Sequence, residues 1–325
     1  MTRVLITGGA GFIGHHVVDH LLRKTEWHIT VLDRLDHSGN LNRLTQLSSF
    51  NRARVRFVYH DLRAPINPQL VQQLGYQSYI LHLAAATHVD RSIEDPMSFV
   101  MNNVVGTCNL LDYARAIHPK RLLYFSTDEV FGPAAPGVFF KEDDRYRSGN
   151  PYAATKAGAE ELCVAYHNTY QLPVIITHTM NVFGERQHPE KYIPLLVRHC
   201  LEGRRIYIHA DPTKTIPGAR TYIHAQNVAD AVLFVLQHGA EGEKYNIVGE
   251  REVDNLTLAK MVGNLVGTPP VYRLADFHSS RPGHDLRYAL DGSKLAALGW
   301  KPPEAFEEGL LHTVQWFLNH DSEWL

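Results

Sequence analysis

Two short runs of residues carry groups that can move protons and hydride. The run Ser126–Glu129 places a hydroxyl and two adjacent carboxylic acids at the end of the apolar segment Leu122–Phe125. Downstream, the phenol of Tyr152 precedes the amine of Lys156 by four residues, so on a helix both face the same way. A binding module does not need so many proton-active groups in one cleft. If they converge, the chain is an enzyme, and its candidate catalytic residues are Thr127, Asp128, Glu129, Tyr152 and Lys156.

A tyrosine four residues before a lysine suits the oxidation of an alcohol by a nicotinamide cofactor. Hydride leaves the carbon while a base takes the hydroxyl proton. A free phenol ionises near pH ~10, and the ammonium of Lys156 is expected to lower the pKa of Tyr152. Lys156 can also bind the cofactor ribose, and Thr127 can hold the substrate oxygen. Alone, Tyr-x-x-x-Lys could be a surface pair, so the interpretation depends on a cofactor site elsewhere.

The N-terminus has the pattern of such a site. The apolar run Arg3–Thr7 leads into the turn Gly8–Gly14, an amphipathic helix and a second strand, Trp27–Asp33. The glycines allow a tight turn, close approach of a pyrophosphate and packing of the helix, whose first N–H groups can hold phosphates. The expected contacts in this turn are Gly8, Gly11, Phe12, Ile13 and Gly14.

Asp33 lies about 20 residues after the last glycine, where an acid accepts the two ribose hydroxyls of a dinucleotide. A carboxylate there repels a 2′-phosphate, so NAD is favoured over NADP, although the adjacent Arg34 could weaken that preference. By itself the glycine pattern could be only a tight turn. Because a strand, a helix and an acid surround it, we interpret it as an NAD site.

Strands and helices continue to alternate, which predicts an α/β fold with a Rossmann-type, doubly wound parallel sheet. Further strands are expected at 55–59, 79–83, 121–125 and 173–177, and helices at 96–117 and, after the N-cap Asn150, at 151–171. Ligands bind beyond the carboxyl ends of such strands, where every motif so far lies. Residues 1–180 with about 221–248 are the predicted NAD-binding domain. About 181–220 and 249–325, which are rich in loops, form a smaller substrate-binding lobe.

Composition excludes several function classes. The 325 residues carry a net charge of −2, which gives no electrostatic reason to expect nucleic acid or a membrane as a partner. The three cysteines are far apart and no apolar run approaches the ~20 residues of a spanning helix, so we expect a cytoplasmic protein without disulfides. The 20 histidines show no set at metal-ligand spacing, so no metal is expected. The acidic run Glu142–Asp144 is expected to be a solvated loop.

With these motifs in place, the chain resembles the extended short-chain dehydrogenase/reductase superfamily of nucleotide-sugar enzymes, and within it the dTDP-glucose 4,6-dehydratases. The similar segments cover nearly the whole chain: Gly8–Gly14, His82–Ser92, Ser126–Gly132, Tyr152–Lys156, His188–Pro194, Tyr245–Ile247, Arg281–Asp285 and Leu298–Pro302. The adjacent Asp128 and Glu129 are the most specific feature, because epimerases and decarboxylases of the superfamily usually lack this pair.

The resemblance implies the dehydration of an NDP-hexose, above all dTDP-glucose. NAD would oxidise C4 with the help of Tyr152 and Lys156, and the 4-ketone would acidify the C5 proton. By resemblance, Glu129 would remove that proton while Asp128 protonates the departing C6 hydroxyl. Hydride would then return to C6, and C5 would be reprotonated. Two neighbouring carboxylates with opposite roles need different environments.

The resemblance also implies further contacts. Beyond the turn and Asp33, the cofactor would meet Asp61, Leu62, Leu83, Ala84, Ala85 and Asn102. The sugar nucleotide would meet Thr87, Thr127, Asn181, Lys191, Tyr207, Arg220, Asn246, Arg281 and His284. The chain departs from the family pattern at Val182–Glu185, after Arg220 and at Tyr207–Pro212, so dTDP, UDP, CDP and GDP all stay open as the nucleotide.

Two other functions use the same fold. A sugar-nucleotide 4-epimerase would use the tyrosine and lysine without elimination, and a non-catalytic NAD-binding regulatory protein would use neither. The intact catalytic set argues against the second. The family further implies a homodimer whose four-helix interface pairs the helices near 96–117 and 151–171.

Overall fold

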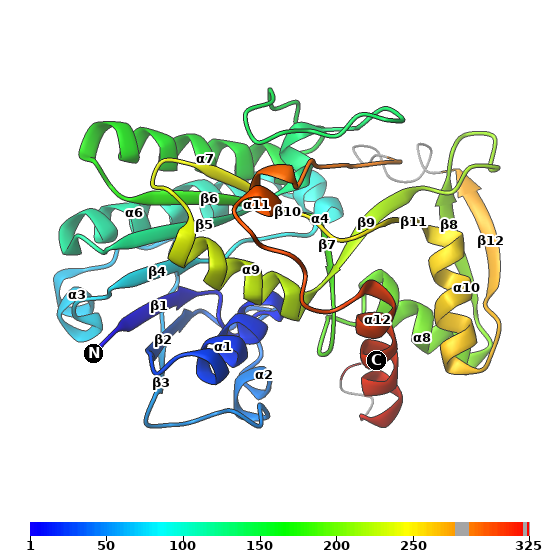
Figure 1. Ribbon diagram of the computed structural model, residues 1–325, viewed down its shortest axis with the longest axis horizontal. Helices are drawn as coiled ribbons and strands as arrows, with labels where there is room; N and C mark the ends of the chain where they lie inside the picture. The colour runs from blue at the N-terminus through cyan, green and yellow to red at the C-terminus, as the bar shows by residue number, and fades with distance from the viewer. Residues whose placement is uncertain (277–285, 321–323, 325) are drawn as a thin grey trace.

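Seven parallel strands form the central sheet, in the order β10-β6-β5-β4-β1-β2-β3 (Figure 1). The computed structural model describes residues 1–276, 286–320 and 324. The strands are β1 (Arg3–Thr7), β2 (His28–Asp33), β3 (Val55–Tyr59), β4 (Tyr79–His82), β5 (Arg121–Thr127), β6 (Val174–Thr179) and β10 (Lys244–Ile247). The predicted doubly wound parallel sheet is confirmed.

Successive residues of the strands face opposite layers of helices. Val4 and Ile6 pack in one apolar cluster with α1 (Phe12–Lys24) and α9 (Ala225–His238). Leu5 packs in a second cluster, to which α3 (Pro68–Leu74), α6 (Gly106–Ile117) and α7 (Pro151–Tyr170) contribute. Because both faces are covered, the strands are apolar on both sides.

The two long helices that were expected are both present. The first is one helical stretch made of α5 (Pro96–Phe99), a π-helical turn (Val100–Val105) and α6. The second, α7, begins as predicted: the Asn150 side chain accepts a hydrogen bond from the Ala153 N–H, and a proline occupies the first helical position.

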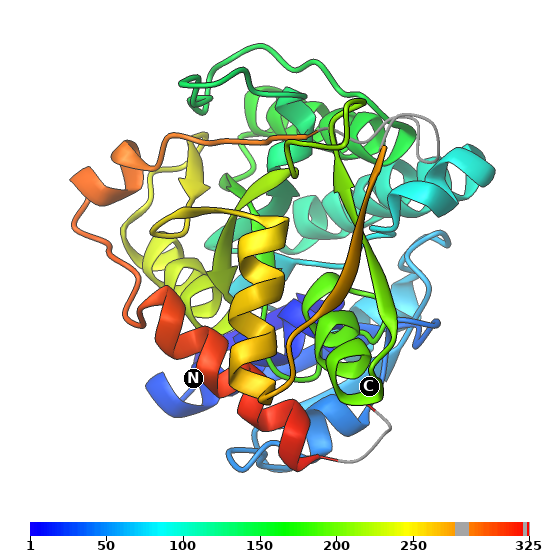
Figure 2. The same ribbon diagram turned by 90° about the vertical axis from the view of Figure 1, so that its right-hand side faces the viewer.

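A third apolar cluster lies in the C-terminal half, around residues such as Leu196, Leu258 and Leu310. It is built from α8 (Tyr192–Glu202), α10 (Asn255–Val266) and α12 (Phe306–Asn319), which lie near the parallel strands β8 (Arg205–Ala210) and β12 (Val271–Asp276) (Figure 2). A small mixed sheet joins β7 (Asn181–Phe183), β9 (Ala219–His224) and β11 (Glu252–Asp254). The shorter elements are α2 (Asn42–Thr45), α4 (Val89–Glu94), a 3-10 turn (Asp128–Phe131) and α11 (Ser293–Ala297). The separate cluster agrees with a second lobe, whose exact bounds stay a prediction.

The expectation of a solvated loop at Glu142–Asp144 is wrong for its first residue. Glu142 is buried, and its carboxylate accepts a hydrogen bond from the backbone N–H of Asn246 at 2.9 Å. The loop is therefore attached to the end of β10 by a carboxylate, a contact that the local run of acidic residues does not reveal.

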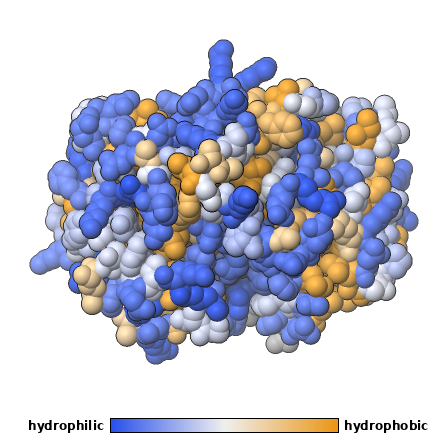
Figure 3. Space-filling model, viewed as in Figure 1, coloured by the Kyte–Doolittle hydropathy of each residue, from blue (hydrophilic) through white to orange (hydrophobic). Residues whose placement is uncertain are grey.

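The surface agrees with the balanced composition. Within residues 1–276, 286–320 and 324, the structure contains no helix that is long and apolar enough to cross a membrane. On the face in Figure 3, hydrophilic residues separate the apolar ones into scattered groups.

A buried histidine joins three distant parts of the chain. His224, at the end of β9 and only 2% exposed, lies 2.9 Å from a Glu304 oxygen and 3.4 Å from a Glu185 oxygen. Burial alone would lower the pKa of His224, but the two carboxylates outweigh it and raise the pKa to about 9. His224 is therefore an imidazolium that links Glu185, next to β7, to the segment before α12.

We predict that the interactions of His224 with Glu185 and Glu304 stabilise the fold and that this stabilisation is lost at alkaline pH. Because the pKa of His224 rises from 6.5 in the unfolded chain to about 9, its contribution is complete below pH 6.5 and disappears as the pH rises through 9. His224→Gln should lower the free energy of unfolding, and the deficit should shrink by up to roughly 3 kcal/mol across that window. Urea titrations at several pH values measure this, with the exposed His238→Gln as control. A deficit that does not change with pH would contradict the prediction.

Candidate active site

A cleft of about 440 Å³ opens at the carboxyl ends of the central strands. It is lined by residues from the turn after β1, the ends of β2, β4 and β5, the first turns of α7 and the segment from β6 to α8. The predicted residues that line it are Gly8, Gly11, Phe12, Ile13, Gly14, Asp33, Asp61, Leu62, Leu83, Ala84, Ala85, Thr87, Asn102, Thr127, Asp128, Glu129, Tyr152, Lys156, Asn181 and Lys191. The convergence inferred from the motifs is therefore present.

Two glycines of the turn, Gly8 and Gly14, have no room for a side chain. Gly8 has a φ of 71°, and a Cβ there would lie 2.7 Å from the Ala84 backbone. A Cβ on Gly14 would lie 2.1 Å from the Gly8 carbonyl oxygen. The turn is thus wedged between the start of α1 and the strand end at Ala84, with its backbone lining the cleft.

Asp33 is held in place at the end of β2. Its carboxylate accepts hydrogen bonds from the backbone N–H groups of Ala10 (3.1 Å) and Leu35 (2.9 Å). Arg34 turns to other partners: it donates to Asp36 at 2.7 Å and to the Asn102 side chain at 2.6 Å. With these contacts, Arg34 is engaged beside Asp33, and the Asp33 carboxylate lines the cleft.

Tyr152 and Lys156 are buried on one side of α7, next to the end of β5. The ammonium of Lys156 donates to the Phe125 carbonyl at 2.7 Å and lies 4.2 Å from the centre of the Tyr124 ring. Burial lowers the pKa of Lys156 to about 8, partly offset by the negative charge of Glu160.

The expected lowering of the pKa of Tyr152 is wrong for the protein as it stands. Burial raises that pKa well above the ordinary value for a phenol, and the charges of Glu129 and Asp128 raise it further, while a hydrogen bond with Thr127 opposes them. Lys156 is directed at Phe125 and Tyr124, so its charge does not offset the burial of the phenol.

The two adjacent carboxyl groups lie in different surroundings. Asp128 is buried, one oxygen accepts from the Thr127 hydroxyl at 3.1 Å, and the other has no hydrogen-bond partner among the described residues. Burial, with a contribution from Glu129, raises the pKa of Asp128 to about 7. Glu129 is more exposed and accepts a hydrogen bond from the Asn150 amide at 3.0 Å. Asp128 can hold a proton near neutral pH, as an acid must.

A buried polar network around Glu160 packs against the end of β5, which carries Ser126 and Thr127. Glu160, one turn after Lys156 on α7, accepts hydrogen bonds from the hydroxyls of Ser126 and Tyr146, and its carboxylate lies 3.1 Å from the His178 ring nitrogen. Lys244 donates to Tyr146 at 2.6 Å. Burial raises the pKa of Glu160, but His178 and the hydrogen bonds outweigh it, so the carboxylate stays ionised.

The structure does not bring every predicted substrate residue to the cleft. Asn246 was expected to contact the sugar nucleotide, but it is fully buried. Its side chain forms hydrogen bonds with His178 and with the carbonyls of Phe140 and Asp291. Tyr207 is 57% exposed on β8 and, in the described residues, lies outside the cleft lining. Arg220 also lies outside that lining. Its positive charge acts on Asp128 and partly opposes the burial that raises the pKa of that carboxyl. Arg281 and His284 fall outside the described residues.

Other lining residues were missed in the sequence. Arg43, on the short helix α2, is buried and donates to the carbonyls of Ser38 and Arg186. Gln187 lines the cleft and donates to the Val182 carbonyl at 2.9 Å. Neither belongs to a motif with a recognisable spacing, so only their position in the fold identifies them.

His82, at the end of β4, makes polar contacts in the core. The two ring nitrogens of His82 lie 2.7 Å from the Thr7 hydroxyl and 2.9 Å from the Thr107 hydroxyl. Across the part of the chain that the structure describes, no group of three or more His, Cys, Asp and Glu side chains is arranged to hold a metal ion.

The fold and the cleft define the class: a Rossmann-type, short-chain dehydrogenase/reductase enzyme of the extended kind. Residues 5–313 match the family model described as GDP-mannose 4,6 dehydratase. The chain belongs to this family.

Relatives are similar over their whole length. A dTDP-glucose 4,6-dehydratase from Neisseria meningitidis is 36% identical, over 100% of this chain and 95% of the relative. The low-salt glycan biosynthesis protein Agl12 from Haloferax volcanii is 40% identical, over 98% and 99% of the two chains. A dTDP-glucose 4,6-dehydratase from Streptomyces venezuelae, solved with NAD bound, is 36% identical with a TM-score of 0.89 and 99% coverage of both chains.

We predict that the chain carries a stability cost at Asp128. Its pKa rises from 3.8 to about 7 on folding, so wild-type protein should lose stability relative to Asp128→Asn as the pH rises between these values. The difference should amount to at most roughly 4 kcal/mol. Chemical unfolding of both proteins from about pH 4 to 8 measures it. The exposed Asp143→Asn should run parallel to wild type, and a parallel Asp128→Asn curve would refute the raised pKa.

Proposed function

We propose that this protein is an NAD-dependent nucleotide-sugar 4,6-dehydratase, a hydro-lyase that acts on dTDP-glucose or another NDP-glucose and forms the 4-keto-6-deoxy sugar. The observation that carries the proposal is that Asp128 and Glu129, in unlike surroundings, line one cleft with Tyr152 and Lys156. The same cleft is lined by the glycine-rich turn after β1. The names of the relatives support the same activity.

The residues of the cleft fit NAD. Gly8 and Gly14 leave a backbone cradle where a Cβ would collide, a Cβ on Gly11 would be tight at 3.0 Å from the Gly8 oxygen, and the start of α1 offers N–H groups to a pyrophosphate. Asp33 would accept the ribose hydroxyls, while Asp61, Leu62, Leu83 and Asn102 line the same part of the cleft. Bound there, oxidised NAD would accept the hydride from C4 of the sugar, and the reduced cofactor would donate it to C6.

We propose that Tyr152 takes the C4 hydroxyl proton while Thr127 holds the oxygen. Because burial and two carboxylates raise the pKa of Tyr152, this step requires added positive charge in the cleft. An oxidised nicotinamide carries such a charge. Lys156, held between the Phe125 carbonyl and the Tyr124 ring, would bind the ribose and keep the helix in register with β5.

The carboxyl groups then divide the elimination between them. Glu129, which accepts a hydrogen bond from an amide, would act as the base at C5. Asp128, whose pKa is about 7, would give its proton to the leaving C6 hydroxyl. An epimerase needs neither group, so the pair favours elimination over a 4-epimerase.

The proposal is tested by incubating the protein with NDP-glucoses and detecting the 4-keto-6-deoxy product. We predict that Glu129→Gln still forms NADH with substrate but loses solvent deuterium incorporation at C5, with turnover reduced roughly 10²–10⁴-fold. The exposed Glu161→Gln on α7 should behave as wild type. Interconversion of gluco and galacto forms without dehydration would show a 4-epimerase instead.

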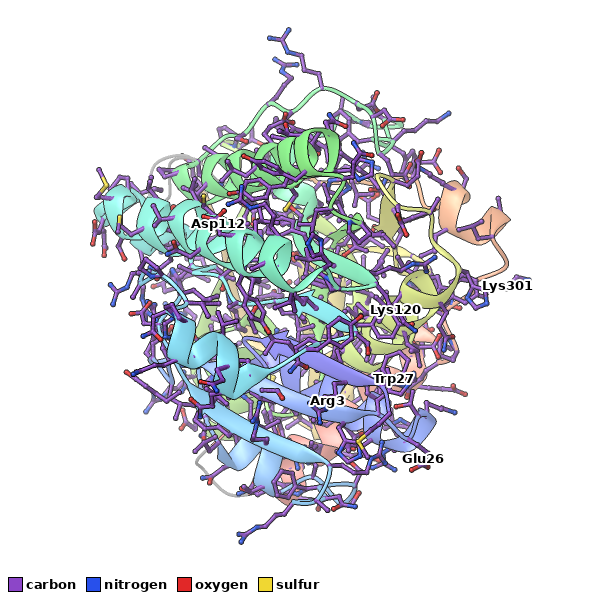
Figure 4. All side chains as sticks on the ribbon, turned by 90° about the vertical axis from the view of Figure 1, so that its left-hand side faces the viewer. Arg3, Glu26, Trp27, Asp112, Lys120 and Lys301 are labelled. Carbon is purple, nitrogen blue, oxygen red and sulfur yellow. The ribbon has the colours of Figure 1, made fainter. Side chains whose placement is uncertain are left out.

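We also propose a cytoplasmic homodimer that pairs α6 and α7 with their copies in a four-helix interface. These helices lie side by side on the face in Figure 4, where Asp112 marks α6. Exposed apolar side chains occur ahead of α6, at Met97 and Met101, and at the last residue of α7, Tyr170. The three cysteines are free thiols, which suits a reducing compartment.

We predict that Met97→Glu, at a side chain that is 65% exposed, weakens this dimer because it places a charge on an apolar interface. Light scattering after size exclusion should show a mass near that of one chain for the variant and twice that for wild type. Ile216→Glu, a similarly exposed site between β8 and β9, is the matched control. A monomeric wild-type protein would contradict the proposed interface.

A further inference from the structure

With its neighbours in the described residues, the Asn150 side chain both accepts and donates a hydrogen bond. Its Oδ1 accepts from the backbone N–H of Ala153 at 2.8 Å, and its Nδ2 donates to the Glu129 carboxylate at 3.0 Å. A backbone N–H can only donate and an ionised carboxylate can only accept. The two contacts therefore fix the orientation of the buried amide, with its NH₂ group toward Glu129.

We propose that Asn150 is a positioning residue that holds the Glu129 carboxylate in place for proton removal at C5. Because it also caps α7, it couples the base to the helix that carries Tyr152 and Lys156. This role rests on the proposed dehydratase activity.

The donor that Asn150 presents is rigid. Its backbone is extended, with φ −147° and ψ 165°, and Pro151 restricts it to that region. The residue is buried, so its side chain has little room to turn. Glu129, by contrast, has a long side chain that stays partly exposed and must lose rotamer freedom to take a single position. A fixed donor from another element supplies that constraint.

Charge gives a second reason for an amide at this position. Asp128 and Glu129 are neighbours; burial raises the pKa of Asp128, and the negative charge of Glu129 raises it further. A neutral donor stabilises the ionised Glu129 without adding negative charge. An aspartate would cap the helix equally well, but it would place a third carboxyl group beside the pair.

The chain contains a second asparagine with the same local structure. Asn67 caps α3, its side chain accepts from the Leu70 N–H at 2.9 Å, and it also precedes a proline in the first helical position. In the described structure Asn67 lies outside the cleft lining. It separates the effect of capping from the effect of the contact with Glu129.

The experiment compares Asn150→Asp, Asn150→Ser and the control Asn67→Asp in the full-length protein with NAD and dTDP-glucose. Asp and Ser both keep a capping oxygen. We expect Asn150→Asp to form NADH normally but to lose roughly tenfold or more in C5 deuterium exchange at neutral pH. The acidic limb of its pH profile should move to higher pH, because a neighbouring carboxylate hinders ionisation of Glu129. Asn150→Ser should lose exchange without that shift, and Asn67→Asp should match wild type.

Three results would overturn the proposal. An Asn150→Asp enzyme with wild-type exchange and pH profile would show that the amide donor is not needed. Equal losses of NADH formation, exchange and unfolding temperature in both Asn150 variants would show a capping role alone. If the wild-type protein makes no 4-keto-6-deoxy sugar while binding NAD, the proposed function fails, and this role fails with it.

Discussion

The placement of two adjacent carboxyl groups at the end of β5, one of them buried, is the constraint on which the rest of the site depends. Two ionised carboxylates side by side repel one another, and burial strengthens the repulsion. The structure separates them by environment: Asp128 is enclosed and favours its proton, whereas Glu129 is partly exposed and receives an amide hydrogen bond. Where the chain turns after β5 therefore gives the two carboxyl groups different surroundings.

That turn is anchored by a buried carboxylate, Glu160, which has several polar partners. Glu160 lies under β5 and gathers Ser126, Tyr146 and His178 around one buried carboxylate. Removing one of these partners would destabilise the fold, because the buried carboxylate would lose part of the interaction that offsets its desolvation. The network therefore fixes α7 against β5, and with it the separation between Lys156, Thr127 and the carboxyl pair.

Much of this arrangement follows from local patterns, and some of it cannot. The β1 turn, Asp33 and the start of α7 were predictable because glycine spacing, a strand-ending acid and an Asn-Pro cap act over a few residues. The burial of Glu142, the structural role of Asn246 and the raised pKa of Tyr152 depend on segments more than 100 residues apart or on the enclosure of the cleft. No spacing in the sequence encodes those contacts.

The charge states of the cleft also restrict when it can work. Asp128 keeps its proton below about pH 7, and Lys156 keeps its positive charge below about pH 8, both because of burial. In the proposed reaction Tyr152 would have the opposite requirement, since its proton would have to leave although burial and the carboxylates raise its pKa. If hydride removal needs a deprotonated phenol while elimination needs a protonated Asp128, bulk pH cannot satisfy both. In the proposed reaction, positive charge on a bound oxidised nicotinamide would favour the ionised phenol, and the Lys156 ammonium would help to hold that cofactor.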